Sequence, residues 1–177
     1  MRCDANGECV YLLTHVDDIA AFAKDETLLT HALNELKRKF AIRDDGKLTY
    51  YLGVNVDWHD NGDIYMHQTA YAERVCTRFA EHMHAKHTDT PHKPGPDGRL
   101  DEGMAAQSQN EIDAMKDVPY AEVVGALGYL VTCTRPDLAY INATLARYLA
   151  NPGPQHWCAA QRVLKYVQGT KNYGITY

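Results

Sequence analysis

Two apolar, β-rich runs near the start of the chain, residues 8–14 and 19–23, are separated by a short polar interruption that contains Asp17 and Asp18. Runs of this length and composition are typical of buried strands, and their close spacing favours a β-hairpin. Ionised carboxylates are costly to bury without a partner, so we expect both aspartates at the exposed tip of that hairpin. There they can offer oxygen ligands to a hard divalent cation such as Mg²⁺. The alternative is that the pair forms a simple polar turn, as most short motifs of this kind do.

The rest of the first half alternates between helical and strand patterns. Leu29, Leu33 and Leu36 recur at helical spacing, and residues 60–63, Asp-Asn-Gly-Asp, have the composition of a tight hairpin turn. The predicted elements are a helix over residues 25–40, a strand over 48–58, a return strand over 64–67 and a helix over 69–83.

Prolines and glycines concentrate in residues 86–109, where large apolar side chains are scarce. We interpret this stretch as an exposed linker. Helical periodicity returns from residue 119 onward, and residues 173–177 could begin another strand. One predicted core stripe consists of Leu138, Ile141, Leu145 and Leu149. The predicted fold class is therefore α+β, a partial antiparallel sheet with packed helices followed by a helical subdomain. The predicted domains cover residues 1–85 and 119–177, with a linker over 86–118.

Charge is distributed unevenly along the chain. The whole chain carries 18 Lys and Arg against 23 Asp and Glu, a net charge of −5. Residues 1–134 hold 13 basic and 22 acidic side chains, a net of −9, whereas residues 135–177 hold five basic and one acidic, a net of +4. A local basic face is sufficient for phosphate contact, so the C-terminal part is a candidate nucleic-acid-binding surface. On charge alone, an ordinary solvated helix face is the favoured alternative.

Other sequence features argue against several kinds of protein and site. No run of 18 or more apolar residues occurs, so no membrane span is predicted. The five cysteines form no Cys-x-x-Cys pair, which argues against a disulfide framework and a zinc ribbon and favours a reducing, intracellular setting. Four histidines could bind Zn²⁺ or Cu²⁺ but lack a cysteine or a well-spaced carboxylate, so a metal-free stretch is the preferred interpretation. These histidines are His82, His84, His87 and His92.

Several motifs follow one another in the order found in one family. Residues 11–19 resemble the hydrophobic–Tyr-Val-Asp-Asp–hydrophobic hairpin of reverse transcriptases. Residues 40–54 resemble the stretch that leads to the Phe-Leu-Gly strand of copia-type retrotransposon polymerases. Further matches to this family are Thr90-Pro91, Pro119-Tyr120, residues 124–130 and 134–140, Asn151-Pro152, His156-Trp157, residues 162–166, Gly169-Thr170 and Tyr173-Gly174. Because the resemblance covers nearly the whole chain in register, the chain is identified as similar to the C-terminal palm and the thumb of a copia-like reverse transcriptase.

This resemblance implies RNA-directed DNA synthesis by the full-length Pol polyprotein, through phosphoryl transfer that uses two Mg²⁺ ions. It makes residues 1–85 a partial palm and residues 119–177 a thumb. Asp17 matches the metal-binding carboxylate of the family's motif, and Asp18 matches its neighbour. The side chains expected to follow the backbone of an RNA/DNA template–primer, without reading its bases, are Arg135, Arg147, Arg162 and Lys165. Tyr148 and Tyr166 are candidate nucleic-acid contacts on the same helices.

The chain also departs from the family's pattern. His15 replaces the motif tyrosine beside the primer terminus. The family's other catalytic aspartate, its fingers and its RNase H domain belong to segments outside this sequence, so we expect no polymerase activity from this polypeptide alone. Those segments are its expected partners, in the cytoplasmic virus-like particle or the nucleus of the parent element. Two other hypotheses stay open, a non-catalytic nucleic-acid-binding module formed by residues 135–177 and a folded relic without present activity.

Overall fold

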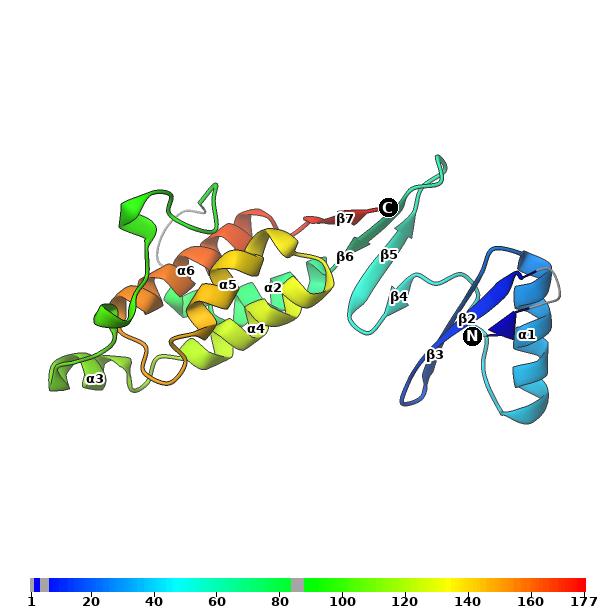
Figure 1. Cartoon of the computed structure of the whole chain (residues 1–177), viewed down its shortest axis with the longest axis horizontal. Coiled ribbons are helices and arrows are strands. Elements are labelled where there is room, and N and C mark those ends of the chain that lie inside the picture. Colours follow the sequence, from blue (N-terminus) through cyan, green and yellow to red (C-terminus); the bar gives the residue numbers. More distant parts are fainter. Residues whose placement is uncertain (1, 4–6, 84–87) are drawn as a thin grey trace. The chain divides into compact units, whose positions relative to one another are not determined.

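The computed structural model describes residues 2–3, 7–83 and 88–177 (Figure 1). Contacts within the chain divide it into an N-terminal unit, Met1–Tyr51, and a C-terminal unit, Leu52–Tyr177. Both units combine helices with antiparallel strands, so the prediction of a mixed α and β fold with antiparallel sheets is confirmed. The palm and thumb boundaries expected at 85/86 and 118/119 stay a prediction, because compactness alone does not define such subdomains. No helix in the described part of the chain combines the length and apolar character that crossing a bilayer requires.

The N-terminal unit is built on the predicted hairpin. Its strands pair antiparallel from Val10 opposite Ala23 to His15 opposite Asp18, which leaves a two-residue connection. A short first strand extends the sheet in the order β1-β2-β3, and a helix lies alongside it (Figure 1). The elements are β1 (Arg2–Cys3), β2 (Cys9–His15), β3 (Asp18–Ala23) and α1 (Glu26–Lys39).

Helix α1 begins where the sequence provides a cap. The Asp25 side chain accepts hydrogen bonds from the backbone N–H groups of Thr27, at 2.7 Å, and Leu28, at 3.0 Å. These bonds satisfy donors that the first turn of a helix leaves unpaired. The last turn carries Lys37, Arg38 and Lys39, whose charges complement the negative end of the helix dipole. The prediction of a helix over residues 25–40 is therefore confirmed.

The hairpin of the N-terminal unit is only partly covered by the rest of that unit. Helix α1 has no fully buried side chain, and among the hairpin residues Val10 and Ala20 are the buried apolar ones. The large apolar side chains left exposed on the two strands are Tyr11, Leu12, Leu13, Ile19 and Phe22. Strand alternation places Tyr11, Leu13 and Phe22 on one face of the hairpin and Leu12 and Ile19 on the other. Exposed apolar side chains that gather on one face are typical of a surface that is covered in a larger assembly.

The C-terminal unit contains a second antiparallel sheet. Strand β6 pairs with β5 on one side and with β7 on the other, so the last strand joins the predicted second hairpin. These strands are β5 (Val54–Trp58), β6 (Ile64–His67) and β7 (Gly174–Thr176). The predicted strand over 48–58 is not continuous, because Leu52 and Gly53 adopt φ angles of 46° and 79° and form a turn after β4 (Tyr50–Tyr51). Leu52 is consequently 38% exposed, whereas Val54 and Val56 are buried as expected.

Four helices of the C-terminal unit surround its hydrophobic core, and Figure 1 shows them side by side. They are α2 (Thr69–Arg78), α4 (Tyr120–Cys133), α5 (Ala139–Ala146) and α6 (Pro154–Gly169). Of the predicted core stripe, Leu138, Ile141 and Leu145 are almost completely buried, but Leu149 is 44% exposed. Helix α5 ends at Ala146, so the helical spacing that would place Leu149 on the buried face no longer applies there.

Part of the stretch rich in proline and glycine packs onto these helices, whereas most of its described residues are exposed, so its interpretation as a linker stays a prediction. Its described part, residues 88–118, includes the short helix α3 (Gln109–Met115) and buries Ala106, which is 6% exposed. The Tyr148 hydroxyl donates a hydrogen bond to the Leu100 carbonyl at 3.0 Å. Side chains from the region of α5 and α6 thus satisfy backbone groups that have no partner in regular secondary structure.

Candidate functional site

The candidate catalytic carboxylates lie at the tip of the β2–β3 hairpin, as the sequence predicts. Asp17 shares the two-residue connection with Val16, and Asp18 is the first residue of β3. Both aspartates are exposed, and Val16 is 88% exposed with a φ of 51°. The left-handed region costs a non-glycine residue about 1–2 kcal/mol, and a β-branched one is rarely found there. Successive cross-strand pairs from Val10 to His15 hold the turn in this conformation.

This hairpin presents two neighbouring exposed carboxylates, Asp17 and Asp18, at its tip. Within the residues that the structure describes, no three His, Cys, Asp or Glu side chains gather as ligands for a metal ion. Mg²⁺ often uses one or two carboxylates together with water and substrate phosphates, but a centre for two ions needs further protein ligands. The side chains that the structure describes therefore fit part of such a centre and not the whole of it.

The four histidines considered as metal ligands are only partly covered by the structure. His84 and His87 lie outside the described residues. The His82 ring packs edge-on against Trp157, with ring centroids 5.2 Å apart, and the His92 ring packs edge-on against Tyr140 at 5.4 Å. Packing thus accounts for the two described rings, and the metal-free interpretation of the cluster stays a prediction.

Arg135 is buried, which corrects its expected role as a template–primer contact. Its side chain is 2% exposed, and it donates two hydrogen bonds to the Asp137 carboxylate, at 2.9 and 2.7 Å. It also donates to the carbonyl and the hydroxyl of Thr170, at 2.9 and 2.8 Å. Its guanidinium carbon lies 5.5 Å from the ring centre of Tyr166 and 5.4 Å from that of Tyr173. Arg135 therefore joins the start of α5 to the end of α6 and is not available to a phosphate.

The environment of Asp137 reflects this pairing. Burial raises the pKa of its carboxyl. The hydrogen bonds and the charge of Arg135, together with a hydrogen bond from Tyr166, lower the pKa by more than burial raises it, so that the pKa lies below its usual value. The carboxylate is therefore held ionised beside the guanidinium, which is the arrangement that makes a buried ion pair tolerable.

Tyr148 and Tyr166, the candidate nucleic-acid contacts, are packing residues that are each 7% exposed. The Tyr148 ring stacks on His156, with centroids 3.9 Å apart and planes 10° from parallel. His156 Nδ1 accepts from the Gly153 N–H at 3.0 Å, and Nε2 lies 3.1 Å from the Asp101 carbonyl, to which it can donate as a neutral ring. Burial lowers the pKa of His156, although its hydrogen bond with Asp101 acts in the opposite direction. The His-Trp motif of the sequence therefore marks a structural junction at the start of α6.

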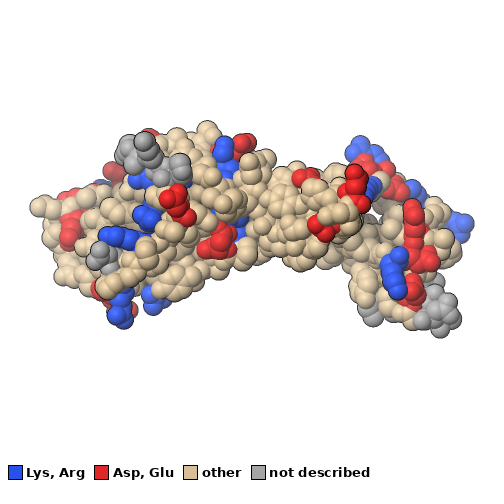
Figure 2. Space-filling model, turned by 90° about the horizontal axis from the view of Figure 1, so that it is seen from above, with Lys and Arg blue, Asp and Glu red and all other residues tan. Residues whose placement is uncertain are grey.

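The other predicted nucleic-acid contacts remain accessible to different degrees. Arg147 is exposed, whereas Arg162 and Lys165 are half-buried on α6. Figure 2 shows Lys and Arg side chains interspersed with Asp and Glu on the face that it displays, with no single continuous basic patch there. The positive net charge of residues 135–177 is thus divided among an interior ion pair, half-buried positions and solvent-exposed ones.

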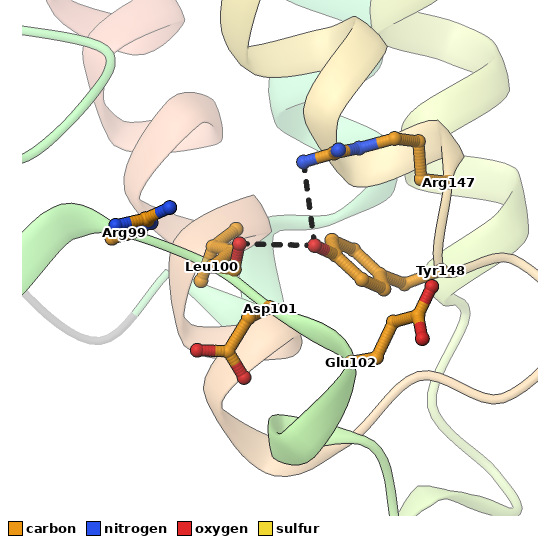
Figure 3. Close-up of a pocket in the computed structure, with 6 residues that line it drawn as sticks. All are labelled: Arg99, Leu100, Asp101, Glu102, Arg147 and Tyr148. Carbon is orange, nitrogen blue, oxygen red and sulfur yellow. Dashed lines mark hydrogen bonds between the residues drawn. The ribbon is translucent and has the colours of Figure 1, made fainter.

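Arg147 lines a cavity of about 250 Å³ that sequence reasoning missed (Figure 3). Figure 3 shows Arg147 and Tyr148, just after α5, opposite a segment that precedes α3, and the Arg147 guanidinium donates to the Tyr148 hydroxyl at 3.3 Å. The lining residues are Arg99, Leu100, Asp101, Glu102, Arg147 and Tyr148. Two arginines and two acids offset one another here, so the cavity has little net charge. No local pattern relates these two segments, because their contact arises only on folding.

The cysteines differ in part from the expectation. Cys9 is disulfide-bonded. Cys76, Cys133 and Cys158 are free thiols. The sequence argues against a disulfide framework, and the structure holds a single disulfide-bonded cysteine beside these three free thiols among the residues that it describes.

Comparison with known proteins identifies relatives of the chain. No family model matches it, and no solved structure matches it. It is 34% identical over 162 residues to the retrovirus-related Pol polyprotein from transposon TNT 1-94 of Nicotiana tabacum, an alignment that covers 91% of the chain and 12% of that protein. It is 33% identical over 166 residues to the retrovirus-related Pol polyprotein from transposon RE2 of Arabidopsis thaliana, covering 94% of the chain and 11% of that protein.

A third relative is an uncharacterized mitochondrial protein of Arabidopsis thaliana. It is 30% identical over 169 residues, which are 94% of the chain and 64% of that protein. The chain spans about a tenth of the length of the Pol polyproteins that it matches. The alignments cover almost the whole chain at about one third identity. The chain is therefore homologous to one short segment of retrotransposon Pol polyproteins.

Proposed function

We propose that this chain is part of the reverse transcriptase domain of a copia-like retrotransposon Pol polyprotein, and that the full-length protein carries out RNA-directed DNA synthesis. The observation that carries the proposal is the exposed hairpin tip with Asp17 and Asp18, in a chain that aligns with a Pol polyprotein over 91% of its length. Two adjacent exposed carboxylates suit Mg²⁺ coordination, and neither contributes to a hydrophobic core.

Each residue of the hairpin tip has a distinct role in this proposal. Asp17 is a direct ligand of Mg²⁺, and Asp18 is the less direct one. The bound ions would stabilise the attacking 3′-oxygen and the leaving pyrophosphate. His15, opposite Asp18 in the strand register, occupies the position of the motif tyrosine beside the primer terminus. Further carboxylates would come from other parts of the polyprotein.

The exposed apolar surface of the hairpin supports a partner within the same polyprotein. Tyr11 and Leu13 are each 53% exposed and Phe22 is 37% exposed, while β3 is an edge strand of its sheet. An unpaired edge beside an apolar face is a ready site for a further strand. In the proposal, the rest of the palm pairs with β3, covers these side chains and, with the fingers, binds the RNA/DNA template–primer.

Primer extension on an RNA template in Mg²⁺ tests the proposal. The 177-residue chain alone is expected to give no extension. A Pol protein that contains it is expected to extend the primer and to lose this activity on Asp17→Asn. Asp60→Asn, which neutralises an exposed acid in the turn after β5, is the matched control and should retain activity. Extension that survives Asp17→Asn would contradict the catalytic assignment.

A non-catalytic nucleic-acid-binding module is the second candidate function. The net charge of +4 over residues 135–177 and the exposure of Arg147 favour it. Binding to an RNA/DNA hybrid should then weaken steeply with added salt, and the combined change Arg162→Ala and Lys165→Ala should reduce both the affinity and the salt slope. A folded chain that binds no nucleic acid would instead favour the hypothesis of a folded relic without present activity.

A further inference from the structure

A second, smaller cavity lies between the segment around residues 91–100 and helices α5 and α6, on the C-terminal unit. Its volume is about 160 Å³, well below that of sites for drug-sized ligands, which begin at about 300 Å³. The residues relevant to its chemistry are His92, Lys93, Gly98, Gln155, Cys158 and Arg162. A cavity of this size suits a small ion or one functional group of a larger ligand.

The charged side chains that line this cavity, among the residues that the structure describes, have one sign. Arg162 and Lys93 are cationic, and none of the lining residues that the structure describes is an Asp or a Glu. The cavity of Figure 3 differs in this respect, because Asp101 and Glu102 line it together with two arginines. A concave site with cationic walls concentrates anions. The smaller cavity is therefore the better candidate for an anion.

The Arg162 guanidinium is incompletely paired. Its Nη2 donates to the Thr90 hydroxyl at 2.9 Å, a neutral acceptor. Its Nε is buried and has no acceptor among the atoms that the structure describes. Leaving a buried donor unsatisfied is costly, more so when the group is charged. An oxyanion in the cavity would supply the counter-charge that the neutral Thr90 hydroxyl does not, and the planar guanidinium fork matches phosphate geometry.

The segment that closes the cavity has no room for a side chain at Gly98. A Cβ atom there would lie 1.7 Å from the Lys93 carbonyl oxygen and 3.1 Å from His92 Cε1. Backbone and side chain of residues 92–93 therefore pack directly on this glycine, which fixes both residues in the cavity wall. The His92 ring is further held by its edge-on contact with Tyr140, which is 70% exposed.

We propose that this cavity binds a phosphate group, with Arg162 as the principal ligand. The phosphate belongs either to a free phosphate or nucleoside monophosphate, or to the backbone of a single-stranded nucleic acid. In the nucleotide cases the exposed Tyr140 ring, beside His92, offers a face on which a base can stack. The site does not depend on the catalytic assignment of Asp17, and it stands or falls separately from it.

The thiol of Cys158 reports on occupancy, because it lines the cavity and is an exposed free cysteine. The experiment measures its alkylation rate by iodoacetamide in the full chain, with peptide mass spectrometry to separate it from Cys133 and Cys76. Inorganic phosphate should slow the reaction of Cys158 saturably, by about tenfold at a concentration of about nine times the dissociation constant. Potassium chloride at equal ionic strength should not slow the alkylation of Cys158. The alkylation rate at Cys133 should stay unchanged in both salts.

Variants identify the ligand residue. Arg162→Gln should abolish the protection, and Arg38→Gln, which changes an exposed arginine on α1 of the N-terminal unit, should leave it intact. Because Arg162→Gln also removes the bond to Thr90, circular dichroism checks its fold, and Arg162→Lys provides a second variant that keeps the charge but loses the fork. Protection that is weakened by Arg162→Lys and absent in folded Arg162→Gln supports the site. Equal protection by phosphate and chloride, or protection that survives Arg162→Gln, overturns it.

The source of the phosphate is resolved by comparing ligands in the same assay. Protection by inorganic phosphate and by a nucleoside monophosphate at similar concentrations assigns the site to a free phosphate group. Protection by a single-stranded oligonucleotide at far lower concentrations, reduced by Tyr140→Ala, assigns it to a nucleic-acid backbone. Both results support phosphate binding, whereas protection by none of the three ligands overturns it.

Discussion

Gly53 precedes β5 in a conformation that a side chain would disturb in two ways. Its φ is 79°, and a Cβ atom added there would lie 2.6 Å from the Tyr129 hydroxyl oxygen. That hydroxyl donates a hydrogen bond to the Leu52 carbonyl. A left-handed conformation costs an L-residue about 1–2 kcal/mol, and displacing Tyr129 breaks a bond worth about 1 kcal/mol. Gly53→Ala should therefore lower the free energy of unfolding of the C-terminal unit by about 2–3 kcal/mol.

The backbone and steric costs can be measured separately. Gly95 lies in the same unit with φ 80° and has nothing within 4 Å of an added Cβ, so Gly95→Ala should cost only the backbone term, about 1–2 kcal/mol. In the Tyr129→Phe background, Gly53→Ala should cost about 1 kcal/mol less than in the wild type, because the hydroxyl is absent.

Urea unfolding of the full chain provides the measurement. Both tryptophans, Trp58 and Trp157, lie in the C-terminal unit, so their fluorescence follows the unit that carries the substitutions. Equal losses for Gly53→Ala and Gly95→Ala, together with no coupling to Tyr129→Phe, would refute the reasoning. A Gly53→Ala loss below about 0.5 kcal/mol would refute it outright, since that is the range of a neutral surface substitution.

Three further predictions concern other parts of the chain. Arg135→Gln leaves Asp137 without its partner and should cost about 3 kcal/mol in urea unfolding, whereas Arg147→Gln should stay within about 0.5 kcal/mol of the wild type. Because burial lowers the pKa of His156 below that of the unfolded chain, the unfolded state binds the proton more readily under about pH 6.5. The free energy of unfolding should thus fall on acidification from about pH 7 to about pH 5, and this component should be missing in His156→Gln. Val16→Gly relieves a left-handed valine and should stabilise the hairpin by up to about 1 kcal/mol, seen as slower amide exchange in β2 and β3; faster exchange would contradict it.

Local patterns predicted the secondary structure well where the signal is contained in neighbouring residues. The two apolar runs and the carboxylates between them indicated the β2–β3 hairpin and its exposed tip. Leu29, Leu33 and Leu36 at helical spacing indicated α1. Such signals depend on spacing and on backbone chemistry within a few residues, so they can be interpreted without knowledge of the tertiary structure. The prediction of one continuous strand over residues 48–58 was wrong. The pattern shows where the apolar residues lie, but it does not show that Leu52 and Gly53 adopt positive φ angles.

The sequence by itself determined which residue types could serve a site, namely an exposed aspartate pair and a set of basic side chains in the last 43 residues, 135–177. Only the tertiary structure decided which of those side chains are accessible. Arg135 is paired with Thr170, 35 positions away, and Tyr148 with Leu100, 48 positions away. Both contacts form between segments that folding brings together, as does the packing of residues 88–118 on the helices. Burial and pairing depend on such distant neighbours, whereas periodicity and charge describe only the nearby chain. For this reason the sequence did not show that Arg135 is buried in an ion pair with Asp137 or that Arg147 lines a cavity.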